Sequence, residues 1–484
     1  MIRPVAYFCA EYELNSSLPI YAGGLGILAG DYLREANDQN VNIVAIGLFY
    51  DFNNSIELDP ILQVDVPIQD KKIKIQVYKY LVGSIPVYLL SSPPITHKLY
   101  VADKETRLKQ EIILGIGGLR ALEALKIHPV AYHLNEGHSA FLALELIRHE
   151  MQERKIGFAD AIAIARQRII FTNHTLVAAG REVYSNDLVA LMLTDYAQEL
   201  GVPVAEIVKL GLVQESSAFS MTMLSLRMAE TVNAVSKLHA QKAVEIWSDH
   251  PMTYVTNGIH IPTWDRTGED VVEGHKTQKG KLLKSLGWDP KTLVLGWARR
   301  FVEYKRPLAI LEDLDRFRHL PVKIIFSGEP HESDIRGKEL LQVLRELIKT
   351  KIGDMAVYIP DYNLEIAKQM VSGCDVWLNT PIVGFEACGT SGMKAALNGT
   401  LPCSTRDGWV DEAEFYGVGW ILDNDHLDEN ILDVLEHDIV PMYYGQPDQW
   451  RKHMKNAREM IINQFSATRM LNEYLGKLYP TSVK

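Results

Sequence analysis

The sequence predicts two α/β domains, each built on a doubly wound parallel sheet with helices on both faces. Three observations lead to this prediction. The chain has 484 residues, which is too long for one ordinary hydrophobic core. Short apolar runs alternate along it with longer segments of helical periodicity. Polar residues or glycines follow most of these runs, and ligands of parallel sheets bind beyond the carboxyl ends of strands.

The apolar runs that we expect to form strands fall into two sets. Those of the first half are Val5 to Phe8, Ile43 to Phe49, Val130 to Leu134, Arg168 to Thr172 and Thr253 to Thr256. Those of the second half are Leu293 to Trp297, Val322 to Phe326, Ala356 to Ile359, Val376 to Leu378 and Val418 to Leu422. Between Lys71 and Leu90 apolar and polar residues alternate, which predicts an antiparallel hairpin at the edge of the first domain.

A polar segment over residues 262–281 indicates the domain boundary. We therefore expect an N-terminal domain over 1–265 that contains the hairpin at about 71–90, and a C-terminal domain over 282–440. The last residues, 441–484, read as helices that could pack back on the N-terminal domain.

Composition restricts the classes of partner. The formal net charge of -11 argues against a general affinity for nucleic acid or for anionic lipid, so any anion site must be local. No apolar run is long enough to span a bilayer, and the first residues do not resemble a signal peptide. The four cysteines form no CxxC pair, which indicates reduced thiols and no metal site. We expect a cytoplasmic protein.

Lys394 stands within a run of small residues, GFEACGTSGMKAALNG, at positions 384–399. Gly389, Thr390 and Ser391 before it offer backbone amides and hydroxyls instead of solvated charge. The pattern fits a ligand site, although a glycine turn followed by a helix with a surface lysine would give the same local sequence.

A second cluster is basic in an acidic chain. The segment WARRFVEYKRP, positions 297–307, carries Arg299, Arg300, Lys305 and Arg306 against the single acid Glu303. Arginine forks combined with a mobile lysine suit phosphate groups, whereas the alternative is a solvated helix start with an internal ion pair.

Glycine and histidine motifs give weaker indications. YAGGLGILAGDYL, positions 21–33, could present backbone amides to an anion or hydroxyl, but it does not fit G-x-G-x-x-G. We interpret GIGGLR, positions 115–120, as close helix packing. His133 is expected to make polar contacts within the fold, whereas His138 opens a helix after a strand, where it could meet a ligand.

The ordered motifs of the whole chain resemble those of the α-glucan phosphorylases, retaining glucosyltransferases that carry pyridoxal 5'-phosphate. They are PIYAGGLGILAGDYL, HLNEGHSAF, FTNHT, VTNGIHIPTW, RRFVEYKRP, PDYNLEIAK, DVWLNTP, EACGTSGMKAALNG and DGW. The resemblance implies a GT-B-like fold with the active site in the interdomain cleft. It also implies reversible phosphorolysis of glycogen or maltodextrin to α-glucose 1-phosphate, and a cofactor phosphate that acts as acid and base. The match is to a short prokaryotic-type form, for which we expect no allosteric site and a homodimer.

The resemblance also assigns roles to single residues. Lys394 would form the Schiff base with the cofactor, whose phosphate would meet Arg299, Thr390 and Ser391, with Tyr362 beside it. The substrate phosphate would be held by Arg300, Lys305 and the backbone amide of Gly24. Contacts to glucose are expected from Leu25, His138, Asn257, Tyr304, Glu386, Cys388 and Gly389. The catalytic set is thus Lys394, Arg300, Lys305, His138 and Glu386, and no metal is involved.

Three departures from the family pattern and two other functions enter the interpretation. Cys388 stands where the family usually has serine, Arg299 replaces the lysine of animal enzymes, and Asn363 replaces an arginine. A nucleotide-sugar glucosyltransferase of the glycogen synthase kind would share the fold but would not need Lys394. A glucan-binding protein without activity would need none of Arg300, Lys305 and Lys394.

Overall fold

The chain folds into two compact units. The computed structural model describes residues 3–50, 56–177, 181–213 and 218–480. Unit 1 comprises Met1–Val235, Ala240–Val255 and Met470–Lys484, and unit 2 comprises Ser236–His239 and Thr256–Arg469. The polar segment 262–281, where the sequence suggested a boundary, forms helices of unit 2.

Unit 1 is built on a sheet of nine strands in the order β11-β10-β7-β6-β1-β2-β5-β4-β3. Their bounds are β1 Val5–Phe8, β2 Ile43–Leu48, β3 Pro60–Ile68, β4 Lys71–Val82, β5 Ile85–Ser91, β6 Ala131–Asn135, β7 Ile169–Asn173, β10 Thr231–Ala234 and β11 Thr253–Tyr254. From β5 to β11 every neighbouring pair is parallel, with Val5 of β1 opposite Ile43 and Ala131. The strand order reverses between β1 and β6, so this sheet is doubly wound.

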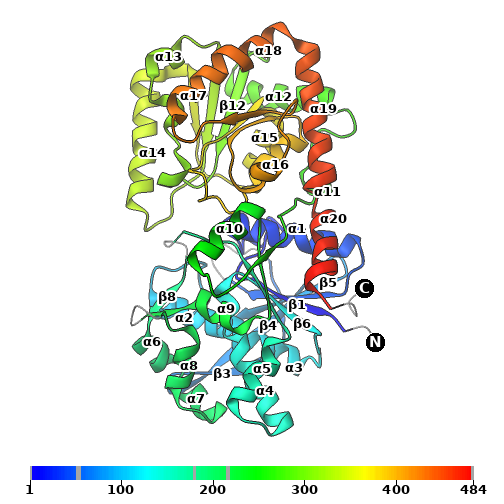
Figure 1. Ribbon diagram of the computed structural model, residues 1–484, viewed down its shortest axis with the longest axis vertical. Helices are drawn as coiled ribbons and strands as arrows, with labels where there is room; N and C mark the ends of the chain where they lie inside the picture. Colours follow the sequence, from blue (N-terminus) through cyan, green and yellow to red (C-terminus); the bar gives the residue numbers. More distant parts are fainter. Residues whose placement is uncertain (1–2, 51–55, 178–180, 214–217, 481–484) are drawn as a thin grey trace. The chain divides into compact units, whose positions relative to one another are not determined.

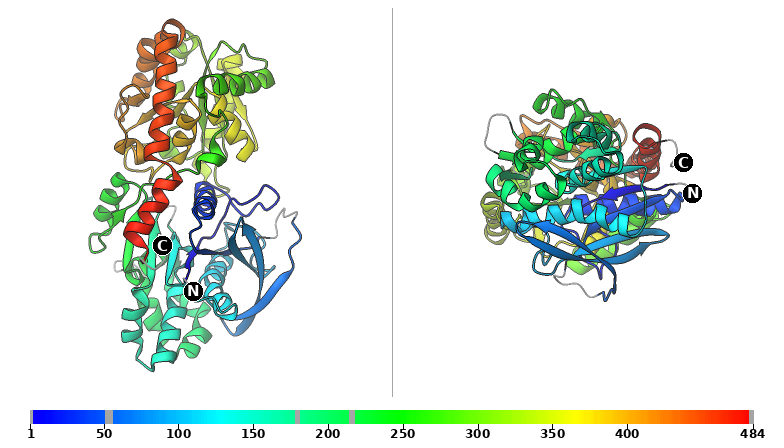
Figure 2. Two further views of the ribbon diagram at one scale, coloured as in Figure 1. Left: turned by 90° about the vertical axis from the view of Figure 1, so that its right-hand side faces the viewer. Right: turned by 90° about the horizontal axis from the view of Figure 1, so that it is seen from below.

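At the other end of this sheet β4 pairs antiparallel with both β3 and β5, where the alternating sequence predicts a hairpin. Figure 2 shows these strands in blue as a long ribbon at the edge of unit 1. A separate small pair, β8 Val183–Ser185 with β9 Ala218–Ser220, was not predicted.

The helices of unit 1 connect these strands. They are α1 Gly24–Asp38, α2 Lys104–Ile112, α3 Gly118–Ala124, α4 Leu142–Arg154, α5 Phe158–Arg166, α6 Asn186–Met192, α7 Thr194–Leu200, α8 Val204–Gly211 and α9 Met221–Met228. Side-chain caps at Asp103, Ser185 and Ser220 begin α2, α6 and α9 by accepting a backbone N–H. The GIGGLR segment packs closely, as predicted, because a Cβ on Gly115 would lie 2.5 Å from the Leu142 nitrogen.

Unit 2 contains a sheet of six parallel strands in the order β14-β13-β12-β15-β16-β17. They are β12 Leu293–Ala298, β13 Val322–Ser327, β14 Ala356–Ile359, β15 Val376–Asn379, β16 Leu401–Thr405 and β17 Trp420–Leu422. The order reverses between the neighbours β12 and β15, so this sheet is doubly wound as well. Every predicted apolar run of either half overlaps a strand, and the predicted fold class is confirmed.

Helices surround this second sheet. They are α11 Ile261–Trp264, α12 Val271–Leu286, α13 Leu314–Arg318, α14 Ile335–Leu347, α15 Leu364–Gly373, α16 Thr390–Leu397, α17 Leu427–Val434, α18 Val440–Gly445 and α19 Pro447–Gln464. Figure 1 shows α12, α15, α16 and α19 grouped beside its strands, and these helices pack on one another. Helices α10 Lys237–Ile246 and α20 Ala467–Glu473 contain residues of both units.

The carboxyl-terminal residues of the described chain complete the core of unit 1. The Tyr479 hydroxyl lies 2.7 Å from Nδ1 of buried His133 and 2.6 Å from the Tyr32 hydroxyl. Nε2 of His133 lies 2.6 Å from Oγ1 of Thr172 on the adjacent strand. Burial lowers the pKa of His133 to about 3, so its ring is neutral, and the predicted role of His133 inside the fold is confirmed.

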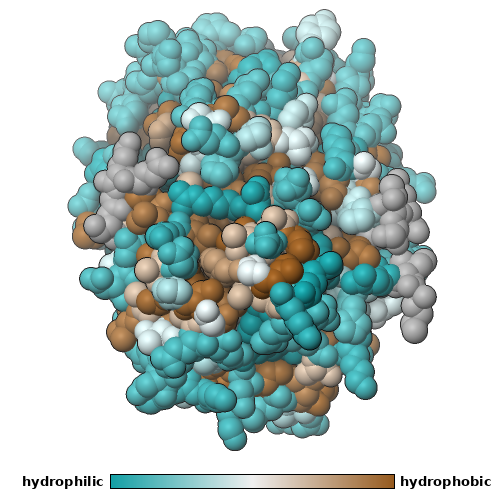
Figure 3. All heavy atoms as spheres, turned by 60° about the horizontal axis from the view of Figure 1, so that its bottom comes forward, coloured by the Kyte–Doolittle hydropathy of each residue, from teal (hydrophilic) through white to brown (hydrophobic). Residues whose placement is uncertain are grey.

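One face of the surface carries both polar and apolar residues. On the face drawn in Figure 3 hydrophilic residues prevail and apolar residues lie between them. In the described part of the chain, no helix combines the length and the apolar character that crossing a bilayer requires.

Candidate active site

The reversal of strand order in unit 2 brings two loops together. β12 ends at Ala298 and continues into Arg299 and the short 3-10 helix η4, Glu303–Lys305. β15 ends at Asn379 and continues into the loop that carries Glu386. Because β12 and β15 are parallel neighbours, their loops leave the sheet at the same edge on opposite sides of the reversal, where doubly wound sheets bind ligands.

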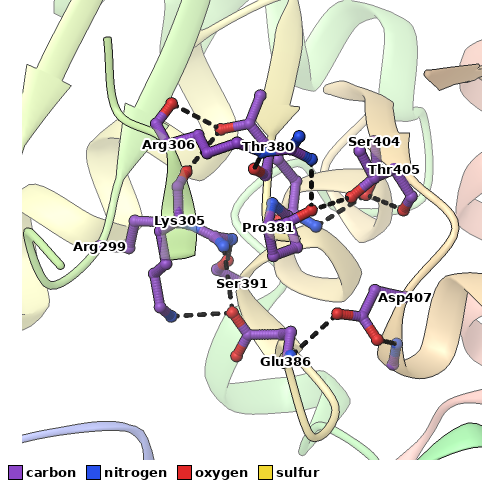
Figure 4. A network of polar contacts seen from close by, with 12 residues as sticks. Arg299, Lys305, Arg306, Thr380, Pro381, Glu386, Ser391, Ser404, Thr405 and Asp407 are labelled. Carbon is purple, nitrogen blue, oxygen red and sulfur yellow. Dashed lines mark hydrogen bonds and ion pairs between the residues drawn. The ribbon is translucent and has the colours of Figure 1, made fainter. Parts of the chain in front are cut away.

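Glu386 is the centre of an ion cluster between these loops. Its Oε2 lies 2.8 Å from Nζ of Lys305 and 3.3 Å from Nη1 of Arg299, and Figure 4 shows all three side chains converging. Nη2 of Arg299 donates to Oγ of Ser391 at 3.1 Å. The side chains of Lys305 and Glu386 are each 13% exposed, so the charges are mostly removed from water.

Electrostatics keep Glu386 ionised. Burial by itself would raise the pKa of this carboxyl group, but the charges of Lys305 and Arg299 outweigh it and hold the pKa below its usual range. Burial, aided by repulsion from Arg299, lowers the pKa of Lys305 despite the opposing charge of Glu386. Two cations therefore face one anion, and the cluster keeps one excess positive charge for a ligand.

Lys394 lies in the second turn of α16, which begins directly after Gly389. Gly389 has φ +81°, a left-handed conformation that favours glycine. The Lys394 side chain is buried, and its Nζ lies 3.9 Å from the centre of the Trp264 ring, an attractive cation–π contact. The interpretation of Lys394 as a surface lysine is therefore wrong.

Asn398, directly after α16, links Trp264 and Lys394. Its Nδ2 donates to the carbonyl oxygens of Trp264 and Lys394, both at 2.8 Å, and its Oδ1 accepts from the Arg266 N–H at 2.8 Å. Its own carbonyl oxygen lies 3.0 Å from Nδ1 of His275. Asn398 is fully buried, so this network fixes the tryptophan beside the lysine.

Polar atoms at the cluster are available for a ligand. In the described part of the chain, buried Nε of Arg299 and buried Oδ1 of Asn257 make no hydrogen bond. Ordinarily buried polar atoms are paired, so each of the two atoms suggests a ligand partner. The first N–H groups of α16, close to Arg299, have no partner within the helix and no side-chain cap from Gly389, and such groups favour an anion. These donors fit a phosphate group beside the Lys394 amine.

The other predicted residues of unit 2 lie in three settings. Arg300 is exposed directly after Arg299. Tyr304 stacks on Phe385, with ring centres 6.0 Å apart and planes 29° apart. Tyr362 is partly buried against the core cluster that contains Trp377.

Cys388 and Asn257 lie together. The Asn257 backbone N–H donates to the Cys388 thiol, whose pKa is raised by burial, so the thiol is neutral. The Cys388 carbonyl oxygen accepts from the Trp409 N–H at 3.2 Å. The substitution of the family serine thus leaves a buried side chain in a loop held through its backbone.

Arg306 does not belong to the ion cluster. Its guanidinium donates to the carbonyl oxygens of Thr380, Pro381 and Asn424 and to the Asn424 side chain, at 2.7–3.0 Å. Figure 4 shows it directed toward Thr380 and Pro381. Arg306 therefore fastens the loop after β15, and the basic segment divides into residues of the site and one structural arginine.

Asn363 also has a structural contact. Its Oδ1 caps α15 by accepting from the N–H groups of Glu365 and Ile366, and its Nδ2 donates to the Asp361 carbonyl oxygen at 3.0 Å. Asn363, one of the departures noted in the sequence, is thus a helix cap in this chain.

Gly24, Leu25 and His138 belong to unit 1. Gly24 is exposed as the first residue of α1, and a Cβ built on it would meet, among the described residues, no heavy atom within 4 Å beyond its chain neighbours and its own helix backbone. The loop before it is fixed by Glu11, whose Oε2 accepts from the N–H groups of Ala22 at 2.6 Å and of Gly23 at 3.0 Å. The amide end of α1 is therefore open and preorganised.

His138 lies in the 3-10 helix η2, Gly137–Ser139, directly beyond β6. Burial, with a further contribution from Arg107, lowers its pKa to about 4, so the ring is neutral. Among the described residues its buried Nδ1 has no hydrogen-bond partner. The ring could thus accept or donate one bond to a ligand.

Sequence reasoning missed Glu136 beside His138. It adopts φ +73°, a strained conformation for a glutamate. Its carboxylate accepts from the N–H groups of Gly137 at 3.1 Å and of His174 at 2.9 Å, and burial raises its pKa to about 7. Trp264, Asn398 and Asp407 were missed too, although each lies in a quoted motif or beside Lys394.

Comparisons with known proteins give the family of the chain. The profile of the family described as Carbohydrate phosphorylase matches residues 102–264 and 289–417. The chain is 35% identical to a maltodextrin phosphorylase of Thermococcus litoralis, over 99% of this chain and 70% of that protein. It is 31% identical to a glycogen phosphorylase of Aquifex aeolicus, over 100% of this chain and 87% of that protein. It is 29% identical to a protein of Methanocaldococcus jannaschii named Uncharacterized protein MJ1631, over 99% of this chain and 100% of that protein.

The two doubly wound sheets and the family match define a GT-B-like glycosyltransferase. Within this class, the chain belongs to the carbohydrate phosphorylase family. The resemblance deduced from the sequence motifs is confirmed.

Proposed function

We propose that this protein is an α-1,4-glucan phosphorylase that converts glycogen or maltodextrin and orthophosphate reversibly into α-glucose 1-phosphate with retention. The observation that carries the proposal is the buried Lys394 amine beside Trp264, on a helix whose first turn touches Arg299. Family membership supports the reaction, since the relatives above are named maltodextrin and glycogen phosphorylases.

The residues present fit pyridoxal 5'-phosphate. The Lys394 amine would hold the cofactor covalently, and Arg299, Thr390 and Ser391 would bind its phosphate. The unpaired Nε of Arg299 supports this assignment, because it leaves one guanidinium donor for an oxyanion. Tyr362 would lie beside the ring. When bound, the cofactor supplies its phosphate group as the acid and base of the reaction.

Arg300, Lys305 and the Gly24 backbone amide would bind the substrate phosphate. Lys305 is already fixed by Glu386 at 2.8 Å, so its charge needs little reorganisation when the anion arrives. Two phosphates at short range repel strongly, and the excess positive charge of the cluster offsets this repulsion. Arg300 is exposed and remains available to an incoming ligand.

Glucose would be held by hydroxyl-binding groups on both loops of unit 2. The Glu386 carboxylate accepts from sugar hydroxyls, and the unpaired Oδ1 of Asn257 offers a second acceptor. Tyr304, Cys388 and Gly389 would complete this contact surface, and we assign Leu25 and His138 to the same ligand from the family motifs.

The proposal includes a cytoplasmic homodimer without nucleic acid or membrane partners. A nucleotide-sugar glucosyltransferase and a glucan-binding protein without activity are the competing functions. Neither requires the buried Lys394.

The test combines an absorption spectrum with an activity assay. Purified protein should show pyridoxal absorbance and release glucose 1-phosphate from maltodextrin only when orthophosphate is added. Lys394→Ala should remain folded and lose both signals, whereas Lys349→Ala, at an exposed position of unit 2, should keep both. Glucose transfer from a nucleotide sugar without bound pyridoxal would refute the proposal.

A further inference from the structure

The loop that carries Glu386 has no regular secondary structure of its own. Between β15 and α16 the chain runs from Thr380 to Gly389 with no strand or helix. Its shape must therefore come from contacts with other segments, because an unsupported loop would not hold a carboxylate within a few tenths of an ångström.

Asp407 supplies the first of these contacts. Its Oδ2 accepts from the Glu386 N–H at 2.9 Å, its carboxylate also accepts from the Gly384 N–H, and its Oδ1 accepts from the Gly408 N–H at 2.8 Å. Figure 4 shows Asp407 directed toward the Glu386 backbone. The residue is 1% exposed, so water does not compete for these bonds.

The two residues after Asp407 hold the other end of the loop. The backbone N–H of Trp409 donates to the Cys388 carbonyl oxygen at 3.2 Å. Gly408 has φ +57°, and a Cβ on it would lie 2.2 Å from the same oxygen, so the close approach requires glycine. The Trp409 ring covers Gly392 of α16, at 3.2 Å from a Cβ built there.

The chemistry of these bonds requires a carboxylate. Three backbone N–H groups from two segments converge on two oxygens that can each accept more than one bond. An asparagine would offer one oxygen, and its amide group would point two donors at N–H groups that are donors themselves. Burying a charge is costly unless it is paired in this way.

We propose that the Asp407-Gly408-Trp409 segment is a positioning device for sugar recognition, in which Asp407 fixes the Glu386 backbone and thereby aims the Glu386 carboxylate. This inference rests on the proposed function. Asp407 acts through Glu386 and touches no substrate itself.

The test is Asp407→Asn in the full-length protein with its cofactor, assayed in the direction of glucan synthesis. Misplacing a binding group by about 1 Å can lower turnover about hundredfold, so we expect kcat/KM for glucose 1-phosphate to fall by about that factor. Pyridoxal absorbance should stay at the wild-type level. Asp411→Asn, in the same short helix η8 (Gly408–Glu412), is the matched control and should keep wild-type kinetics.

A double-mutant cycle separates positioning from a general loss of structure. If Asp407 acts through Glu386, Asp407→Asn should have little further effect in a Glu386→Gln background. Additive effects would overturn the inference, as would wild-type kinetics of Asp407→Asn. Should Asp407→Asn not fold, Asp407→Glu keeps the charge but displaces it by one methylene, and wild-type kinetics there would overturn the inference equally. Absence of phosphorolysis in the wild-type protein would instead refute the proposed function.

Discussion

Replacing Lys305 by methionine removes one side of a buried ion pair and keeps most of the apolar stem. Glu386 would then keep its contact with Arg299, whose Nη1 lies at the longer distance of 3.3 Å. Breaking a buried pair from one side costs about 3 to 5 kcal/mol. Because Arg299 compensates part of the charge, we expect a loss near the lower limit, about 3 kcal/mol in the free energy of unfolding.

Urea unfolding of the wild type, Lys305→Met and the double variant Lys305→Met/Glu386→Gln measures this quantity. The double variant removes the stranded charge as well, so it should recover about 2 kcal/mol of the loss. Phosphorolysis, which the wild type should catalyse, should be negligible in both variants, because each lacks Lys305, the residue proposed to bind the substrate phosphate. The double variant would thus regain part of its stability without regaining activity.

The exposed Lys349→Met is the control and should change stability by less than about 0.5 kcal/mol. The reasoning fails if Lys305→Met is as stable as this control. It also fails if the double variant is no more stable than Lys305→Met alone, since the Glu386 charge would then not be the source of the loss.

Three further predictions concern single side chains. Arg300→Ala should lower kcat/KM for orthophosphate about hundredfold at unchanged cofactor content, and steady-state assays with varied phosphate check this; an unchanged value would remove Arg300 from the site. Asn398→Ala frees the carbonyl oxygens of Trp264 and Lys394, so we expect a loss of about 2 kcal/mol in unfolding free energy and weaker pyridoxal phosphate binding in equilibrium dialysis. An unchanged affinity for pyridoxal phosphate would mean that Asn398 does not support cofactor binding. Burial raises the pKa of Asp407 to about 6 from 3.8, so its contribution to stability is present at low pH and is lost as the pH rises through 6. The stability of the wild type relative to Asp407→Asn should fall by about 2 kcal/mol between pH 4 and 7 in urea titrations, whereas a constant difference would mean that Asp407 titrates normally.

Periodicity was sufficient to predict the parallel sheets, because buried parallel strands are apolar on both faces and stand out as continuous runs. Two parallel strands, β10 and β16, were missed; the sequence of β16, LPCST, contains a proline and two hydroxyl residues. The bonds that make it a strand come from β15 and β17, which are distant in sequence. Only the tertiary fold identifies such a strand.

The local sequence left the roles of Lys394 and of the basic segment open, and the family resemblance, rather than residue type alone, assigned them to the candidate site. Arg306 shows the limit of this reasoning, because its composition is that of a phosphate ligand while its bonds go to carbonyl oxygens. Asp407 was not singled out for the same reason. Its role depends on N–H groups more than twenty residues earlier, and no local pattern reports that proximity.

The contact of Tyr479 with His133 and Tyr32 has a consequence for synthesis on the ribosome. Unit 1 includes the first 235 residues of the chain and also its last fifteen, whereas almost all of unit 2 is the continuous stretch Thr256–Arg469. A nascent chain that has exposed the whole of unit 2 still lacks the final segment of unit 1. Domains usually fold in the order in which they emerge. In this protein the unit that starts first finishes last, because Tyr479 can reach His133 only after the whole of unit 2 has been synthesised.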